Sequence, residues 1–462
     1  MSKVLKLIRY NTGTDKKLFK EFADRFDAVI MNATIAAYSG SAMADLVSIY
    51  KDKYIIDPQT HILQQDFDTL AVEKKKGGKE LKKSIVKYLE QLPNVFKNKL
   101  FSNECIDTDI IKDNLHELVE DVGGFQLDYI NSFIEKNEYG KYIKFIEEVE
   151  GVVFKPEPRL LVAPYFMLKS YYPYDVIVEW LELNKQSIDL FCQKFSETNF
   201  PIAAQLVIEK GILGDMADDE TGMLKAISKT YNGLDFEYIF IWVDDFSPIE
   251  ADARLTKAFA KLLKELSRIG KSPIMAYGGY DSILLCHQDS PTRLYGVAQS
   301  VGYGEQRQIT PVGGGLPTNR YYFPPIHQRL RLNDVELILS ANGFFNNNRQ
   351  SSQRAIDFYS QICDCRQCKN TIEDDMDNFL QYNESKPFVM SSGVRRNRPT
   401  QDAIEISARH YLYRRIAEWA DINTKSFSEL IGEYRTNILK YGKYHVHNLH
   451  LRISEWIEHY AE

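Results

Sequence analysis

Eight short apolar runs, rich in β-branched and aromatic residues, recur between residues 4 and 301 of this 462-residue chain. Most are followed by a segment with helical periodicity, and several are apolar on both faces, as parallel strands between two layers are. This alternation predicts an α/β fold, a (β/α)8 barrel of the TIM type, with an open doubly wound sheet as the alternative. The predicted strands are residues 4–9, 28–33, 54–56, 159–168, 202–208, 238–243, 273–277 and 294–301.

The uneven spacing of these runs predicts how the chain divides into domains. Residues 63–157 separate the third run from the fourth and have helical periodicity, which predicts a helical insertion in a barrel of residues 1–305. Beyond the barrel the alternation stops, and a C-terminal subdomain is expected over residues 306–462. Its apolar pattern predicts a strand at residues 335–340 and two or three amphipathic helices from Ala403 onward.

Charge and hydropathy narrow the functional class. The chain has 57 basic and 64 acidic side chains, a formal charge of −7, which argues against a generally basic nucleic-acid binder but permits local basic tracks. One such track is a run of lysines from Lys74 to Lys87, which forms either a solvated helix face or a path for a phosphate backbone. No apolar stretch is long enough to span a membrane and no signal segment is evident, so a soluble cytoplasmic protein is expected.

Three cysteines form the motif C-x-C-x-x-C at Cys363, Cys365 and Cys368. Thiolates at this spacing can converge on one tetrahedral ion, and His410, on a predicted helix, is the expected fourth ligand. A Cys3His set with no vacant position predicts a structural zinc site. Three cysteines without a ligand are the alternative, and the other possible fourth ligands are His445, His447 and His450.

The motif followed by Arg-His on a helix resembles the tRNA-guanine transglycosylase superfamily, in which a zinc subdomain follows a barrel. The C-terminal segment HNLHLRISEWIEHY is similar to the closing helix of that family. The segment YIIDPQTH resembles a branch that acts on DNA, where a base is exchanged for a 7-deazaguanine. The resemblance therefore implies a nucleic-acid substrate, with DNA favoured over tRNA.

Asp57 directly follows the third apolar run, which places it at the carboxyl end of a strand, with His61 four residues later. The resemblance implies that Asp57 is the acid/base toward the departing base, although Gln59 and Thr60 stand where the family has glycines. A helix-capping role for Asp57 is the alternative. Asp121, in DVGGFQ, matches the family's letters more closely but lies in a segment with helical periodicity.

Asp244 and Asp245 end another predicted strand, where paired carboxylates can divide acid and base roles between them. They can equally cap the next helix. The resemblance implies that Gln205, inside a strand, recognises the base, since an amide offers both a donor and an acceptor. Tyr277 and Tyr303 are further candidates for substrate binding at the mouth of the barrel, and so is His61.

The resemblance also implies a nucleophilic aspartate at the end of the last barrel strand, and the corresponding run has none. Glu305 is the first acid beyond it. Loss of the nucleophile with retention of an acid/base favours hydrolysis over base exchange. The alternative is that Glu305 or Asp244 serves as the nucleophile.

Basic and aromatic residues after the barrel predict a nucleic-acid groove. They lie in a glycine-rich segment and in VRRNRP, and the candidates are Arg320, Tyr321, Arg395 and Arg396.

These observations predict an enzyme that flips a modified base out of DNA and hydrolyses its N-glycosidic bond, leaving an abasic site, with phage defence as its context. The first alternative is a transglycosylase that inserts a 7-deazaguanine into DNA or tRNA. The second is a catalytically inactive barrel that only binds nucleic acid. The sequence leaves the oligomeric state open, a homodimer included.

Overall fold

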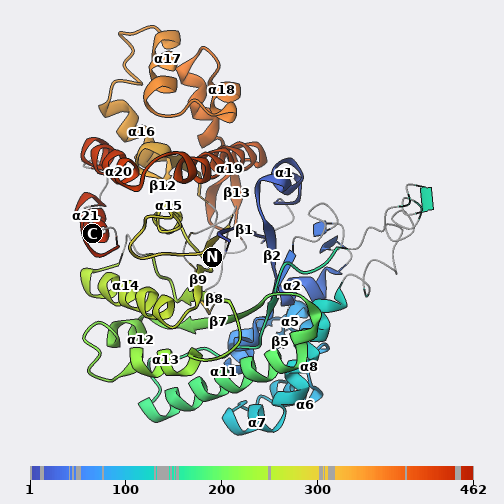
Figure 1. Ribbon diagram of the computed structural model, residues 1–462. Helices are drawn as coiled ribbons and strands as arrows, with labels where there is room; N and C mark the ends of the chain where they lie inside the picture. The colour runs from blue at the N-terminus through green and yellow to red at the C-terminus, as the bar shows by residue number, and fades with distance from the viewer. Residues whose placement is uncertain are drawn as a thin grey trace.

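One sheet of eight parallel strands forms the centre of the computed structural model (Figure 1), in the order β3-β2-β1-β10-β9-β8-β7-β6. A parallel bridge between Tyr54 and Pro158 joins the two ends, so the sheet is a nearly closed barrel rather than an open one. The strands are β1 (Leu5–Arg9), β2 (Ala28–Asn32), β3 (Tyr54–Asp57), β6 (Leu161–Val162), β7 (Ile202–Ile208), β8 (Tyr238–Val243), β9 (Ser272–Met275) and β10 (Gly296–Ser300).

The structure describes most but not all of the chain. It covers residues 3–10, 15–40, 54–74, 77–129, 156–247, 251–300, 318–390, 393–442 and 449–460, with short stretches at 42–43, 46–47, 305 and 307–310 and isolated positions between 132 and 151.

All eight predicted strands are present because their residues are buried on both faces. In β8, Tyr238, Phe240 and Trp242 belong to an apolar cluster enclosed by the barrel, whereas the alternate residues pack outward. The fourth run forms only the short β6 and a bridge at Leu168, since Pro164 interrupts it and has no N–H for a ladder. The surrounding helices are α1 (Asp15–Phe22), α2 (Ala33–Tyr38), α11 (Tyr174–Phe195), α12 (Lys210–Asp215), α13 (Met223–Tyr231), α14 (Ala253–Arg268) and α15 (Tyr280–Leu284).

Helices fill much of the interval between β3 and β6, as predicted. The lysine run ends in an exposed helix face, with Lys83 and Lys87 on α5 (Lys83–Leu89). Its first part is a hairpin of β4 (Ala71–Glu73) and β5 (Lys79–Leu81). Gly77 and Gly78 at the turn have φ of +86° and +82°, a left-handed backbone that interrupts a helix. The helices are η2 (Thr60–Gln64), α4 (Phe67–Leu70), α5 (Lys83–Leu89), α6 (Asn94–Phe101), α7 (Thr108–Asp113) and α8 (Leu115–Leu127).

After the barrel, helices and two antiparallel hairpins follow. The strand predicted at residues 335–340 is wrong, because Val335, Ile338 and Leu339 are buried at helical spacing within α16. Two or three helices were expected from Ala403 onward, and the structure has three. The elements are β11 (Arg320–Phe323), β12 (Gln328–Arg331), α16 (Leu332–Ala341), α17 (Ser351–Gln361), α18 (Arg366–Ile372), η5 (Met376–Asn383), β13 (Ser385–Val389), β14 (Arg395–Pro399), α19 (Gln401–Thr424), α20 (Phe427–Tyr441) and α21 (Leu449–Tyr460).

The C-terminal helices pack back onto the barrel (Figure 1). The Tyr460 hydroxyl at the end of α21 donates to the Thr256 carbonyl of α14 at 2.7 Å. On α19, the fully buried Arg415 forms ion pairs with Glu305 and with Glu418. In the portion of the chain that the structure covers, no helix has the length and apolar character needed to cross a bilayer.

Candidate active site and metal centre

Three thiols and one imidazole converge in the C-terminal region. Cys363 follows α17, Cys365 caps the first turn of α18, and Cys368 lies within that helix, while His410 comes from α19. The His410 Nδ1 atom lies 3.3 Å from the sulfurs of Cys365 and Cys368 and 3.9 Å from that of Cys363. These separations fit a tetrahedral ion, for which metal–sulfur and metal–nitrogen distances place S and N about 3.5 Å apart. The cluster can therefore hold a metal ion.

Surrounding groups orient these donors. The His410 Nε2–H donates to the Tyr322 carbonyl at 2.7 Å, which leaves Nδ1 free to face the thiols. The Tyr321 ring stacks on the His410 ring with centroids 4.2 Å apart, and its hydroxyl lies 3.1 Å from the Cys368 sulfur.

Tyr321, predicted to bind substrate, is fully buried and supports the metal cluster instead. Of the alternative ligands, His445 and His447 lie outside the described residues. His450 is part of the backbone of α21, and its side chain also lies outside the described part of the structure.

Asp57 ends β3 inside the top of the barrel and is 2% exposed. Its Oδ1 accepts hydrogen bonds from the Tyr165 hydroxyl at 2.7 Å and from the Gln59 N–H at 3.2 Å. Its Oδ2 accepts from Arg9 at 3.1 Å. Three donors, one of them a guanidinium, fix this carboxylate in place.

Sequence reasoning missed Arg9. It ends the apolar run LKLIR at an inward position of β1, and it also donates to the Ala276 carbonyl at 2.8 Å while its guanidinium lies 4.4 Å from the Tyr277 ring centroid. The signal in the sequence was a charged residue at a position whose side chain points into the barrel, where the other inward residues, Leu5 and Leu7, are apolar. A buried charge requires a partner, and in this barrel the partner is Asp57.

A cavity of about 180 Å³ lies at the barrel mouth and is lined by residues that follow Asp57, such as Gln59 and His61. The His61 ring makes an edge contact with Trp242 at 5.4 Å and stacks on Tyr165 at 5.6 Å. The His61 Nδ1 lies 3.1 Å from the Tyr165 hydroxyl, so a hydrogen-bonded chain leads from the cavity wall through Tyr165 to Asp57. Its walls include Asn32, Thr34, Gln59, His61, Trp242, Arg307, Ile309 and Thr310.

Burial lowers the pKa of His61 to about 4. An unfolded histidine titrates near 6.5, so between about pH 6.5 and 4 only the unfolded chain binds the proton, and stability is lost as the pH falls through this window. From pH 7 to pH 5 this loss is about 2 kcal/mol. His61→Gln should remove this pH-dependent loss. Between pH 7 and pH 5 the free energy of unfolding of the variant, measured in urea, should therefore fall by about 2 kcal/mol less than that of wild type. An identical pH dependence in both proteins would contradict a neutral, buried His61.

Asp244 and Asp245 do not act as a pair that faces the cavity. The Asp244 Oδ1 accepts from the Ile309 N–H at 2.7 Å, and burial raises the pKa of this carboxyl, with a smaller contribution from Asp245. Asp245 has a left-handed backbone with φ of +44° and points to Lys210, whose Nζ lies 3.6 Å from Oδ2. Asp244 thus anchors the segment that crosses the mouth, and Asp245 lies on the rim.

Glu305 faces the C-terminal helices. It pairs with the buried Arg415 and lies 3.4 Å from the Tyr411 hydroxyl, and it does not line the mouth cavity. A neighbouring carboxyl that sequence reasoning missed, Asp281 of α15, is also buried there. Its burial, and then the charge of Glu305, raise the pKa of Asp281 to about 7.

The remaining candidates are dispersed. Gln205 lies inside the barrel between Ala203 and Val207 of β7, and its Nε2 has no hydrogen-bond partner among the described residues. Tyr277 is buried against Arg9 and Trp242. Tyr303 lies outside the described residues.

Three arginine candidates and Asp121 lie away from the mouth cavity. Arg320 is half-buried in β11, whereas Arg395 and Arg396 are exposed on β14. Asp121 is in α8, as its helical periodicity predicted.

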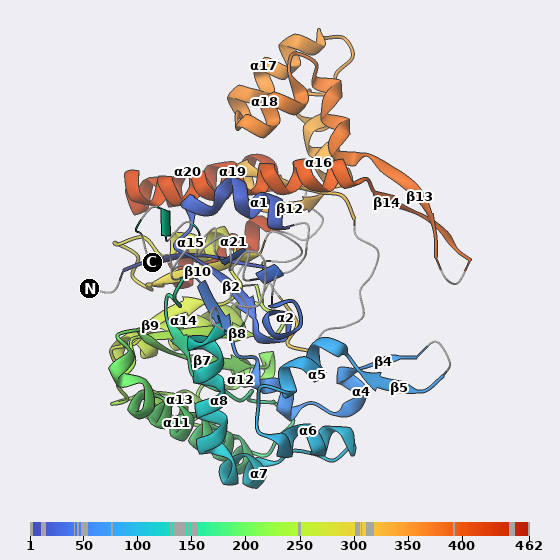
Figure 2. The ribbon, with the colours of Figure 1, turned by 90° about the vertical axis from the view of Figure 1, so that its right-hand side faces the viewer.

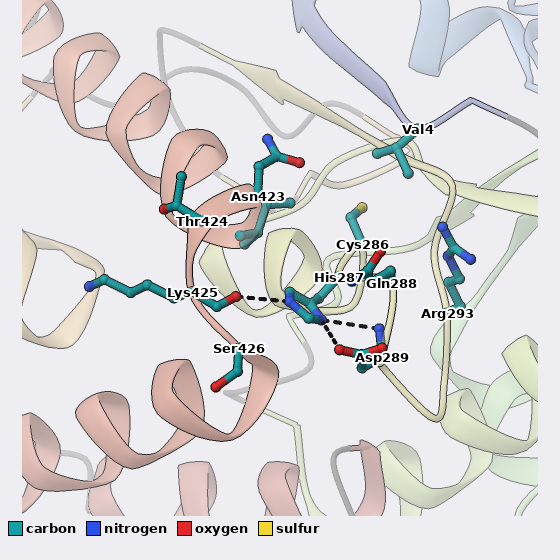
Figure 3. Close-up of a pocket in the computed structure, with 11 residues that line it drawn as sticks. Val4, Cys286, His287, Gln288, Asp289, Arg293, Asn423, Thr424, Lys425 and Ser426 are labelled. Carbon is teal, nitrogen blue, oxygen red and sulfur yellow. Dashed lines mark hydrogen bonds and ion pairs between the residues drawn. The ribbon is translucent and has the colours of Figure 1, made fainter.

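A second cavity, of about 450 Å³, lies at the opposite end of the barrel (Figure 3). It is lined by residues that precede β1 and β10, such as Val4 and Arg293, and by the connection between α19 and α20. His287 accepts from the Asp289 N–H and contacts the Lys425 carbonyl, both at 3.1 Å. Because the amino-terminal face of such barrels serves stability, the mouth cavity is the better active-site candidate.

Comparison of the chain with models of known protein families gives no match, and comparison with curated proteins gives none either.

Proposed function

We propose that the barrel mouth hydrolyses the N-glycosidic bond of a base extruded from DNA. The observation that carries this proposal is Asp57, a fixed carboxylate at the carboxyl end of a barrel strand, connected through Tyr165 to His61 in the wall of a small cavity. Buried carboxylates held in this way are suited to acid/base work on a reacting group.

The cavity suits a single ring system. An apolar cavity of about 150 Å³ accommodates benzene, so the 180 Å³ cavity has room for a base of similar size. The Trp242 and His61 rings in its wall are the kind of surface on which an extruded base stacks.

In the proposed reaction the bond between C1′ and the base nitrogen breaks, and its electron pair goes to the base. A water oxygen forms the new bond to C1′, and its proton enters the chain from His61 through Tyr165 to Asp57. The chain then returns a proton to the released base, so no oxidant or cofactor is consumed.

The backbone after Asp57 supports the family resemblance. Gln59 has φ of +49°, in the left-handed region that glycine prefers, and it stands where the family has a glycine. The Gln59 side chain stabilises this turn by accepting from the Thr34 hydroxyl at 2.7 Å. A DNA-acting relative of the tRNA-guanine transglycosylases is therefore our proposal for the class of this enzyme.

We infer that Zn²⁺ occupies the Cys3His cluster. Three thiolates and one imidazole form a typical structural zinc set with no vacant position for water. In this proposal the metal stabilises the C-terminal region and takes no part in the chemistry.

The proposal predicts base release without an incoming base. Glu305, the acid that follows the last barrel strand, is engaged by Arg415 and is therefore not placed to hold the sugar covalently. Abasic sites in DNA carrying modified bases, quantified as alkali-labile breaks, should reach the same yield with and without added guanine or 7-deazaguanine. Incorporation of labelled base without abasic sites would show instead that the enzyme is a transglycosylase.

A further inference from the structure

The hairpin of β13 and β14 projects away from the body of the protein (Figure 2). Its strands pair from Ser385 with Pro399 to Val389 with Arg395. The segment from Ser385 to Pro399 contains four basic and no acidic side chains. Among the residues that the structure covers, no carboxylate lies within 4.0 Å of its basic groups, so these charges are available to a partner.

The two faces of the hairpin differ. Lys386, Phe388, Arg396 and Arg398 share one face, and the Arg398 guanidinium lies 5.0 Å from the Phe388 ring centroid. Toward the tip, Val389 is 56% exposed and Val394 is 48% exposed. A basic two-stranded ribbon with exposed side chains is suited to contacts with the phosphate backbone that position a protein on DNA.

The other projecting hairpin, β4–β5, extends on the same side of the molecule (Figure 2) but has a different charge pattern. Lys74 lies 3.7 Å from Glu80, and Lys79 lies 2.8 Å from Asp68. These two lysines are thus partly neutralised by neighbouring acids. The β13–β14 hairpin is the stronger candidate for a polyanionic partner.

The metal cluster fixes the base of the β13–β14 hairpin. The Tyr382 hydroxyl, just before β13, lies 3.5 Å from the Cys368 sulfur, and His410 lies on the helix that follows β14. Thr310 lines the mouth cavity, and Thr318 lies beside the hairpin base in a shallow cavity with Ser385. Thr318 is eight residues after Thr310, and eight fully extended residues span at most ~29 Å. The base of the hairpin therefore lies within about one helical turn of DNA, ~34 Å, of the mouth.

We propose that the β13–β14 hairpin is a DNA-binding arm that enters the major groove of duplex DNA beside the extruded base. The proposal rests on the proposed function and adds that the substrate is double-stranded. A two-stranded ribbon fits the B-DNA major groove, which is about 12 Å wide. The major groove of an RNA duplex is too narrow for side chains to reach the bases, which argues for DNA.

The test compares two triple variants that each remove three positive charges. R395A/R396A/R398A changes the arm, and K112A/K185A/R254A changes partly or fully exposed residues of α7, α11 and α14. Affinity for a short unmodified DNA duplex is measured at several salt concentrations. The arm variant should bind roughly 10- to 100-fold more weakly near 0.1 M salt, with a salt slope lower by up to ~3. The control should bind as wild type does.

Equal binding by the two triple variants would overturn the proposal, and so would a loss seen with tRNA but not with duplex DNA. Because the probe duplex is unmodified, its binding does not depend on base release. Base release by wild type from a modified duplex is measured in parallel. If wild type releases base but the arm variant binds normally, only the arm is refuted. If no base is released but the arm variant binds weakly, only the proposed function is refuted.

Discussion

Asp57→Asn is expected to release base ~10²–10⁴ times more slowly than wild type, because a neutral amide cannot accept and return a proton as the carboxylate does. The variant should bind DNA as wild type does. The substitution preserves size and the hydrogen bond from Tyr165. The measurement is single-turnover release of free base from modified DNA. Asp245→Asn, on the rim beside Lys210, is the matched control and should retain the wild-type rate.

Arg9 complicates the stability of this variant, since Asp57→Asn leaves a buried guanidinium without its carboxylate partner. Breaking a buried ion pair by removing one partner costs about 3–5 kcal/mol. The double variant Arg9→Met/Asp57→Asn removes both charges and should unfold closer to the wild-type temperature than the single variant. It should still release base slowly. Wild-type rates in either variant would contradict a catalytic Asp57 and move the assignment to Asp244.

Cys365→Ser is expected to lose the metal and unfold the C-terminal region. Structural zinc binding supplies an apparent ~10–16 kcal/mol of folding free energy in small metal sites, far more than one hydrogen bond. The wild-type protein should contain about one zinc per chain, and the variant none, by metal analysis. Limited proteolysis should cut the variant after the barrel, in the region that contains α17 and α18.

Cys105→Ser is the control for this experiment, because Cys105 is an exposed cysteine far along the chain from the cluster. It should keep both the metal and the protease resistance of wild type. Removal of zinc with a chelator should reproduce the Cys365→Ser result and should also weaken DNA binding by the β13–β14 arm, whose two ends the cluster fixes. Zinc-free wild-type protein of unchanged stability would contradict a structural metal.

Local patterns in the sequence predicted the frame of this fold. Runs such as Tyr238–Val243 are apolar on both faces, and that pattern alone requires burial between two layers. The cysteine spacing predicted the metal cluster for a similar reason, since three of its four donors lie within six residues. His410 was predicted as the fourth donor because it lies on a segment with helical periodicity beyond the motif. Periodicity failed at residues 335–340, where a short apolar run fits a strand and a helix equally well.

Only the tertiary structure decided the environment of the candidate catalytic groups. Asp57 receives its hydrogen bonds from Arg9 and Tyr165, which come from other barrel strands or the loops beside them, 48 and 108 residues away. Glu305 is engaged by Arg415, and Tyr321 is taken up by the metal cluster. A sequence pattern reports the preference of each segment for burial and backbone shape. The charge, solvation and proton affinity of a side chain depend on groups that the closed barrel brings together from distant parts of the chain.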